Sequence, residues 1–291
     1  MSDDEDLARE FAELRPRLVG VAYGLLGSVE EAEDVVQDAW LRLSRQEPGH
    51  VGDVAGWLVV TVSRLALDVL RSVRHRREEY VGPWLPEPVV TGPEAADPAD
   101  RVTLDESMSI AMMVVLESLS PAERTAFVLH DVFGLPFEEI AVAVGRTPAA
   151  CRQLAARARR HVAARAPRFS VDGAEHRRVV DAFARACEAG DLDALLAVLD
   201  PDVVLLSDGG GLARAARRPI LGDAKVARFL LGVAAKFGPG PRFTPMAVNG
   251  WPGLARVGGG RLTHVFGLAV ADGRVTEIDI VINPEKLRRT T

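Results

Sequence analysis

The sequence is poor in the residue types that mark secreted, disulfide-bonded or metal-binding proteins. Only two of its 291 residues are cysteine, Cys151 and Cys187, and they neither build a disulfide framework nor match the spacing of a metal site. No run of about 18 apolar residues occurs, so no membrane-spanning helix is expected. The start of the chain is acidic and lacks an apolar core, so no signal peptide is expected. These absences predict a cytoplasmic protein without a metal, a cofactor or a membrane partner.

Lysine is also scarce, and arginine carries most of the positive charge. The only lysines are Lys225, Lys236 and Lys286, in a chain whose formal net charge is -6. Seven arginines lie between Arg146 and Arg168, and no acidic residue interrupts them. In an acidic chain, such a local concentration of guanidinium groups indicates contact with a nucleic-acid backbone. A solvated basic helix on an ordinary helical bundle is the alternative.

The arginine-rich segment has the pattern of a helix-turn-helix. Apolar residues repeat at helical spacing over residues 137–144, and Gly145 follows where a left-handed residue can end a helix. Thr147 and Pro148 then provide an N-cap and a proline at the first position of a second helix, expected to reach about residue 162. Arginine and glutamine can each form two hydrogen bonds with base edges in the major groove. The residues predicted to share the exposed face of this helix are Arg152, Gln153, Ala156 and Arg157.

Two helices are expected near the N-terminus, over residues 7–26 and from residue 29 to residue 43. The second begins after Ser28, which has Glu31 three residues on, the spacing of a capping box. One face of this helix is apolar, and the opposite face carries Asp34, Gln37 and Asp38. By spacing alone, that second face is a solvated acidic surface.

Residues 57–70 are strongly apolar and continue into a cluster of arginines. The segment starts at Trp57, and its basic residues include Arg64, Arg71 and Arg74. A helix that is apolar at its start and basic at its end places cations where DNA phosphates could lie. The alternative is a set of arginines that complement the dipole at the helix C-terminus.

Residues 79–105 are rich in proline and acidic residues and show no helical period, so a linker is expected. Within it, prolines bracket Trp84 and Leu85 in the run GPWLPEP. Two large apolar side chains are poorly placed in free solvent, so we expect this segment to dock on a neighbouring domain and bury them. An apolar anchor in a disordered linker is the alternative.

Four helices are expected over residues 104–165, of which the last two form the helix-turn-helix. The first of the four is predicted over residues 104–119. Ser120 and Glu123 then form a second capping box, with Pro121 at the first helical position of a helix that reaches residue 132.

The last third of the chain mixes helices with strands. Helices are expected over residues 174–189, 192–199 and 221–237, and strands near residues 203–207, 243–248, 254–257, 261–270 and 274–282. Helices followed by a curved antiparallel sheet predict an α+β cone. Because such a cone encloses an apolar pocket, Asp208, His264 and Asp279 are candidates for acid–base catalysis there. An empty or regulatory pocket is the favoured alternative.

Three motifs, in order along the chain, resemble those of bacterial sigma factors. Residues 32–43 (AEDVVQDAWLRL) resemble the segment that binds core RNA polymerase, residues 57–77 the segment that melts and reads the minus-10 element, and residues 119–160 the domain that reads the minus-35 element. Domain two over residues 1–78, a linker over 79–105 and domain four over 106–168, with no third domain between them, resemble the extracytoplasmic-function (ECF) sigma factors. Residues 172–287 resemble the SnoaL-like branch of the nuclear-transport-factor-2-like fold, as in the sigma J-like group.

The resemblance implies a fold, partners and site residues. The fold is multidomain, with two all-α domains, the second containing the helix-turn-helix, followed by the α+β cone. The implied partners are promoter DNA and core RNA polymerase, bound at the clamp helices of its largest subunit, without a catalytic residue or cofactor. The implied contacts are Asp34, Gln37 and Asp38 for polymerase, Trp57, Arg64, Arg71 and Arg74 for the minus-10 element, and Thr147, Arg152, Gln153 and Arg157 for the minus-35 element.

The resemblance also implies regulation in cis, because the motifs WLPEP, DGGG and NPEKL occur in a group whose third domain takes the place of a separate anti-sigma protein. The residues expected at this regulatory contact are Trp84, Leu85, Pro86, Asp208, Gly209, Asn283, Pro284 and Leu287. A small molecule in the cone is one candidate for the signal. Two alternatives remain. One is a helix-turn-helix regulator that senses a ligand through the cone, and the other is a bifunctional protein with an enzymatic cone.

Overall fold

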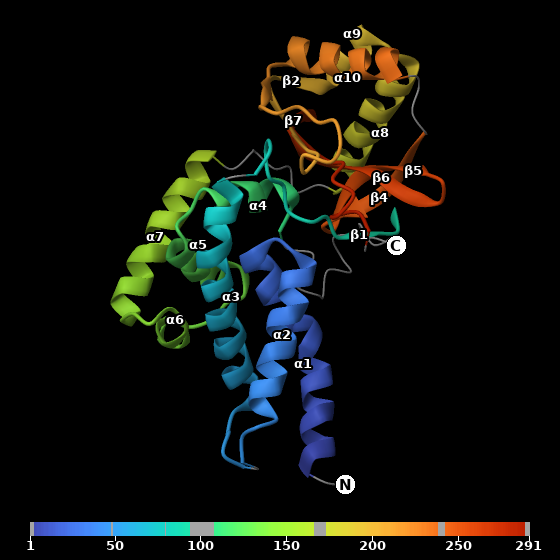
Figure 1. Cartoon of the computed structure of the whole chain (residues 1–291). Helices are drawn as coiled ribbons and strands as arrows, with labels where there is room; N and C mark the ends of the chain where they lie inside the picture. Colours follow the sequence, from blue (N-terminus) through green and yellow to red (C-terminus); the bar gives the residue numbers. More distant parts are fainter. Residues whose placement is uncertain are drawn as a thin grey trace. The chain divides into compact units, whose positions relative to one another are not determined.

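The computed structural model describes residues 3–47, 49–78, 80–93, 108–165, 173–237 and 242–288 (Figure 1). Contacts divide the chain into two compact units. Unit 1 consists of Met1–Glu78, Val102–Asp105 and Val115–Arg165, and unit 2 of Glu79–Arg101, Glu106–Val114 and Ala166–Thr291. None of the helices in the described ranges combines the length and the apolar character that crossing a bilayer requires.

The N-terminal part of unit 1 is a bundle of three helices, α1 (Asp3–Leu26), α2 (Val29–Leu43) and α3 (Val54–Glu78). The predicted N-cap of α2 is confirmed, since Oγ of Ser28 accepts a hydrogen bond from the N–H of Glu31 at 3.4 Å. The apolar face of α2 is buried, as its spacing predicts. This burial leaves the polar face of the helix to solvent.

The second part of unit 1 contains α5 (Pro121–Phe127), the π-helical turn η4 (Val128–Val132), α6 (Phe137–Val144) and α7 (Pro148–Arg165). The capping box at Ser120 is confirmed: Oγ of Ser120 accepts from the N–H of Glu123, whose Oε2 accepts from the N–H of Ser120. The single helix predicted up to residue 132 instead ends in the π-helical turn. The helix-turn-helix is also confirmed, since Gly145 closes α6 in the left-handed conformation, with φ 70° and ψ 40°.

The helix predicted over residues 104–119 is shorter than expected. Helix α4 runs from Ile110 to Glu117, and the expected start at residue 104 lies outside the described residues. Met108 is described and buried, but it is not helical. Because Oγ of Ser109 accepts a hydrogen bond from the N–H of Met112 at 3.1 Å, it caps the helix there.

Unit 2 is an α+β fold, which confirms the predicted class. Its helices are α8 (Gly173–Ala189), α9 (Leu192–Val198) and α10 (Asp223–Phe237). Its strands are β1 (Val90–Thr91), β2 (Leu199–Asp208), β3 (Ile220–Leu221), β4 (Phe243–Val248), β5 (Trp251–Gly258), β6 (Arg261–Ala271) and β7 (Arg274–Val281). They form one sheet in the order β1-β4-β5-β6-β7-β2-β3.

The sheet differs from the prediction in three respects, of which one is the short strand β3, since no strand was expected at Ile220 and a helix was expected to begin at residue 221. It is mixed instead of antiparallel, because β2 pairs with β7 in parallel. Its first strand comes from the linker, where β1 pairs antiparallel with β4. The predicted turn at Asp272 and Gly273 is confirmed, with positive φ at both residues, and Asn249 with Gly250 forms a second turn of this kind that the sequence analysis missed.

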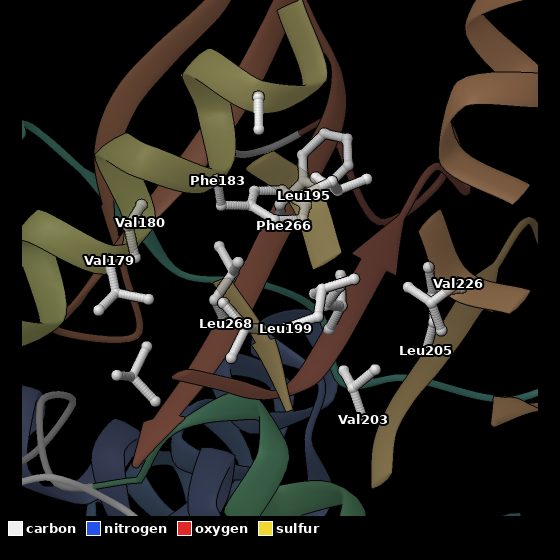
Figure 2. Close-up of a cluster of buried hydrophobic side chains, with 14 of the residues drawn as sticks. Val179, Val180, Phe183, Leu195, Leu199, Val203, Leu205, Val226, Phe266 and Leu268 are labelled. Atoms are coloured by element: carbon white, nitrogen blue, oxygen red, sulfur yellow. The ribbon is translucent and has the colours of Figure 1, made fainter. Parts of the chain in front are cut away.

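Each face of the sheet packs against a separate apolar cluster. On one face, side chains of α8, α9 and α10, among them Phe183, Leu195 and Val226, pack against Phe266, Leu268 and other strand residues (Figure 2). On the other face, Leu85 of the linker, Ile110 and Leu287 pack against strand side chains such as Val265 and Val281. Because side chains alternate along a strand, neighbouring strand residues serve different clusters.

Candidate functional site

The residues predicted to bind polymerase lie together on one exposed face of α2. Asp34, Gln37 and Asp38 are exposed, and within the described part of the chain their side chains have no hydrogen-bond or ion-pair partner. Leu41, one turn further along the same face, is 43% exposed. Acidic groups beside an exposed leucine form a surface suited to a protein partner with basic and apolar groups.

The residues predicted to contact the minus-10 element lie along α3. Trp57 is half-buried, and Arg71 is exposed and pairs with Asp68 at 3.2 Å. The side chain of Arg74 lies outside the described residues. Arg64 is exposed but engaged, because its Nε and Nη2 donate hydrogen bonds to the carbonyl oxygen of Val142 at 3.0 and 2.8 Å. Val142 belongs to α6, so Arg64 ties the first helix of the helix-turn-helix to α3.

The residues predicted to contact the minus-35 element surround the exposed N-terminal half of α7. Thr147 caps the helix, with Oγ1 accepting from the N–H of Ala150 at 3.2 Å. Gln153 is exposed and points away from the buried face of the helix. The two arginines are held by acidic groups of other helices: Arg152 by Glu138 at 3.4 Å, and Arg157 by Glu123 at 3.0 Å. These exposed ion pairs are weak, so phosphate or base acceptors can replace the carboxylates.

The linker residues predicted to dock lie against a buried carboxylate at the end of β2. Asp208 is 0% exposed. Its Oδ1 accepts hydrogen bonds from the Tyr80 hydroxyl at 2.6 Å and from the N–H of Gly210 at 2.9 Å, and its Oδ2 accepts from the N–H of Leu85 at 2.9 Å. A buried carboxylate needs such partners, because an unpaired charge in an apolar interior is costly.

A lysine whose side chain is 13% exposed completes the site. Nζ of Lys286 lies 2.7 Å from Oδ2 of Asp208 and also donates to the carbonyl oxygen of Leu85. The same ammonium group lies 4.2 Å from the ring centroid of Trp84 and 5.3 Å from that of Tyr80. One cation therefore holds the carboxylate, the linker backbone and two aromatic rings.

Two further groups of contacts fix the linker in unit 2. Leu85 is fully buried in the cluster with Ile110 and Leu287, and Pro86 beside it is buried too. Beyond the WLPEP motif, the N–H and C=O of Val89 both bond Asn249, and β1 then adds to the edge of the sheet. The segment is thus held by side chains at one end and by backbone pairing at the other.

The glycine run after Asp208 allows the tail to approach closely. Gly210 has φ 61°, and a Cβ atom there would lie 2.3 Å from Nδ2 of Asn283. A Cβ atom on Gly209 would lie 2.4 Å from the carbonyl oxygen of Ala213. Nδ2 of Asn283 is thereby free to donate to the Tyr80 hydroxyl at 2.9 Å.

Of the eight residues predicted at the regulatory contact, the structure connects five, directly or through Tyr80 and Lys286: Trp84, Leu85, Asp208, Asn283 and Leu287. Pro86 and Gly209 are buried next to Leu85 and Asp208 in the chain, and Pro284 is exposed. The sequence analysis missed Tyr80, Lys286 and Asn249, which supply several of the polar contacts. The scarcity of lysine could have drawn attention to Lys286, and the Asn-Gly dipeptide to the turn at Asn249. Tyr80 is one of only two tyrosines, but it belongs to no motif that the sequence analysis identified.

The three candidates for catalysis do not form a site. His264 lies on the face of the sheet covered by the helices, beside Phe266. Asp208 and Asp279 alternate with residues of that face and so lie on the other side, where Asp208 is occupied by the linker. The structure therefore does not bring an Asp–His pair together among these three residues, and their placement gives the enzymatic alternative no support.

Asp279 instead makes the stability of the fold sensitive to pH. Burial raises its pKa well above the usual value, and the neighbouring carboxyl of Glu277 raises it further, while burial raises the pKa of Glu277 to about 7. In the folded protein, the carboxyl groups of Asp279 and Glu277 stay protonated at pH values where the same groups have already lost their protons in the unfolded chain. These two carboxyl groups therefore contribute most to the free energy of unfolding at acidic pH, and their contribution is lost as the pH rises towards 7.

We expect Asp279→Asn to reduce this fall by roughly 1–3 kcal/mol between about pH 5 and about pH 8. Urea unfolding of parent and variant at the two pH values measures the difference. Asp202→Asn, at an exposed position, is the matched control and should leave the pH dependence unchanged. An equal loss of stability in parent and Asp279→Asn would contradict the assignment.

The structure combines an acidic helix face, a helix-turn-helix and an α+β unit that binds the linker between them. This combination defines a transcription protein of the sigma-factor class. Residues 11–77 match the family described as Sigma-70 region 2, and residues 109–162 match Sigma-70, region 4. The chain is 45% identical over 287 residues to the ECF RNA polymerase sigma factor SigJ of Mycobacterium tuberculosis, covering 95% of this chain and 92% of the relative. It is 37% identical to the probable ECF RNA polymerase sigma factor SigI of the same species, covering 99% and 97%.

The fold agrees with this similarity. The crystal structure of SigJ from M. tuberculosis matches with a TM-score of 0.78 and 41% identity, over 96% of this chain and 97% of that one. The chain therefore belongs to the ECF sigma factors of RNA polymerase. Its partners are core RNA polymerase and promoter DNA, and its relatives are named as sigma factors and not as enzymes.

Proposed function

We propose that this chain is a sigma factor in which unit 2 controls promoter recognition in cis by holding the linker between the two sigma regions. The observation that carries the proposal is the engagement of the linker by Asp208 and Lys286, with Leu85 fully buried. A linker held at fixed points restricts how far regions 2 and 4 can separate. On this proposal the chain has no catalytic activity and acts in the cytoplasm, where its polymerase partner works.

The exposed face of α2 is the proposed polymerase contact. Asp34, Gln37 and Asp38 would meet basic groups of the clamp helices in the largest polymerase subunit. Among the described residues their side chains have no hydrogen-bond or ion-pair partner, which supports this role because no such ion pair has to be broken before binding.

Promoter binding would require unit 1 to open. The minus-10 and minus-35 elements lie roughly 25 base pairs apart, which is roughly 85 Å of duplex at about 3.4 Å per base pair. A compact unit of this size has a radius of gyration of about 14 Å. Helices α3 and α6, which carry or support the two DNA-reading surfaces, are joined by the hydrogen bonds from Arg64 to Val142. Separating them would free Arg64 for the melted minus-10 strand, where Trp57, Arg71 and Arg74 are the other proposed contacts.

Within the helix-turn-helix, the proposed minus-35 contacts are Thr147, Arg152, Gln153 and Arg157. The N-terminus of α7 has no acidic residue in its first turn, so its dipole favours a phosphate there. Arg152 and Arg157 would exchange their carboxylate partners for base edges or phosphates.

We expect Arg152→Ala with Arg157→Ala to lower initiation at promoters of the chain by at least tenfold, since two charge-assisted DNA contacts are lost. Run-off transcription with core polymerase on a library of genomic fragments measures this effect. Arg177→Ala with Arg178→Ala, at exposed positions on α8, removes the same charge and should have little effect. Core-polymerase binding, followed separately, should persist in both double variants, and its loss together with transcription would contradict the assignment to DNA.

A further inference from the structure

Unit 2 contains a cavity between α10 and the sheet that the linker contacts leave unused. Its volume is about 90 Å³, several times the ~15 Å³ that one water molecule needs. Most of its wall is apolar, with Phe229, Phe243 and Phe266 facing the space from three elements. The cavity lies on the helix-covered face of the sheet, opposite the face that holds Asp208 and Leu85.

The charged groups in the wall are cationic. Of the described residues that line the cavity, Arg214 and Arg256 carry charge at neutral pH, and none is an aspartate or a glutamate. Burial lowers the pKa of His264 to about 4, and the nearby Arg256 lowers it too, so this imidazole is neutral at physiological pH. A neutral imidazole can donate a hydrogen bond without adding a charge.

Among the described residues, Arg256 is a lining cation without an ion-pair partner. It is half-buried, its guanidinium carbon lies 4.3 Å from the ring centroid of Phe243, and its buried Nε has no hydrogen-bond acceptor in the described part of the chain. Glu188 is near enough to influence the pKa of Arg256, but its Oε1 accepts from the N–H of Phe243 at 2.8 Å, and no ion pair joins the two among the described residues. An unsatisfied donor on a partly desolvated cation is unfavourable until an anionic acceptor arrives.

We propose that this cavity binds a small aromatic or apolar carboxylate, with the carboxylate on Arg256 and the apolar body against the phenylalanines. The planar guanidinium group offers paired donors that match a carboxylate, and stacking on Phe243 fixes its orientation. Ser207 and His264 lie in the same wall and can hydrogen-bond a second polar group of the ligand. The site does not depend on the regulatory role of the linker.

The test is a titration of the full chain with three compounds of the same size: benzoate, the neutral benzamide and the cationic benzylamine. Ligand-observed NMR gives the three dissociation constants. We expect benzoate to bind at least tenfold more tightly than benzamide, and benzylamine not to bind. Equal affinities for benzoate and benzamide, or no saturable binding of benzoate, would overturn the proposal.

Two variants locate the binding. Arg256→Met keeps an unbranched side chain but removes the charge, and should abolish the preference for benzoate over benzamide. Val233→Trp fills the cavity from α10 and should weaken the binding of both benzoate and benzamide. If Arg256→Met does not fold, this variant shows whether the cavity is the binding site. Arg228→Met, on the same helix and outside the lining, is the matched control and should bind benzoate like the parent. Unchanged benzoate binding in Val233→Trp would show that benzoate binds elsewhere, and would contradict the proposal.

Discussion

Replacing Asp208 with asparagine is expected to release the linker from unit 2. The substitution keeps the size of the side chain but replaces one carboxylate oxygen by an NH₂ group. In the parent, both oxygens accept hydrogen bonds, so the NH₂ group would face hydrogen-bond donors. If the amide nitrogen takes the place of Oδ2, it faces the N–H of Leu85 and the ammonium of Lys286. If the amide is flipped, the nitrogen faces the N–H of Gly210. Breaking a buried ion pair on one side costs about 3–5 kcal/mol, and we expect the lower end of this range here because the Lys286 side chain, left without its counterion, is 13% exposed.

Amide hydrogen exchange of the peptide that spans Tyr80 to Val90 measures the release. We expect exchange at Leu85 to be at least tenfold faster in Asp208→Asn than in the parent. Asp202→Asn, an exposed neutralisation in the same strand, is the control and should exchange like the parent. Adding Lys286→Met to Asp208→Asn should recover part of the lost stability, since the uncompensated cation disappears.

Run-off transcription with the same variants tests the regulatory proposal separately. If the held linker controls promoter recognition, Asp208→Asn changes the yield of transcripts while Asp202→Asn does not. Faster exchange at Leu85 with unaltered transcription would show that the docking is structural and that the cis-regulatory proposal is wrong. Unchanged exchange at Leu85 would instead contradict the role assigned to Asp208 itself.

The second large effect is expected on polymerase binding. Asp34→Ala with Asp38→Ala should weaken binding to core polymerase by at least tenfold, because two charges on one helix face lose their complementary partners. Both side chains are exposed and have no internal partner in the described part of the chain, so the free energy of unfolding should change by less than about 0.5 kcal/mol per site.

Titration of labelled core polymerase, at low and at high salt, measures this affinity. The parent should lose affinity with salt more steeply than the double variant, because screening weakens the contacts that the variant already lacks. Glu10→Ala with Glu13→Ala, at exposed positions of α1, removes the same charge from another helix and is the control. Parental affinity in the α2 variant, or an equal loss in the α1 control, would contradict the assignment of the α2 face.

Local patterns predicted most helices and the helix-turn-helix because the groups that stop and start these helices are neighbours in the chain. Ser120 and Glu123 cap each other within one turn, and Gly145 closes α6 next to the residues it terminates. The start of α4 was missed because Ser109, a less conspicuous cap, lies inside a segment whose apolar period continues upstream. The π-helical turn η4 shares the spacing of apolar residues with an α-helix, so periodicity does not distinguish the two.

The sheet was only partly predictable, because only some of its paired strands are neighbours in the chain. Strands β4 to β7 follow one another through short turns, and alternation with turn residues is visible in the sequence. The parallel pairing of β2 with β7 and the addition of β1 to β4 join segments far apart in the chain. Two-residue strands such as β1 carry no readable pattern, since their stability comes from the edge that receives them.

The sequence by itself determined that this chain carries an acidic helix face, an arginine-rich helix-turn-helix and an apolar motif in a polar linker, because each depends on residues within a few turns of one another. Only the tertiary structure decided what the linker binds. Asp208 lies 128 residues from Tyr80 and 78 from Lys286, and Lys286 lies 201 from Leu85. Polar contacts at such separations follow from how the sheet brings its strand ends together, and no local pattern encodes that arrangement.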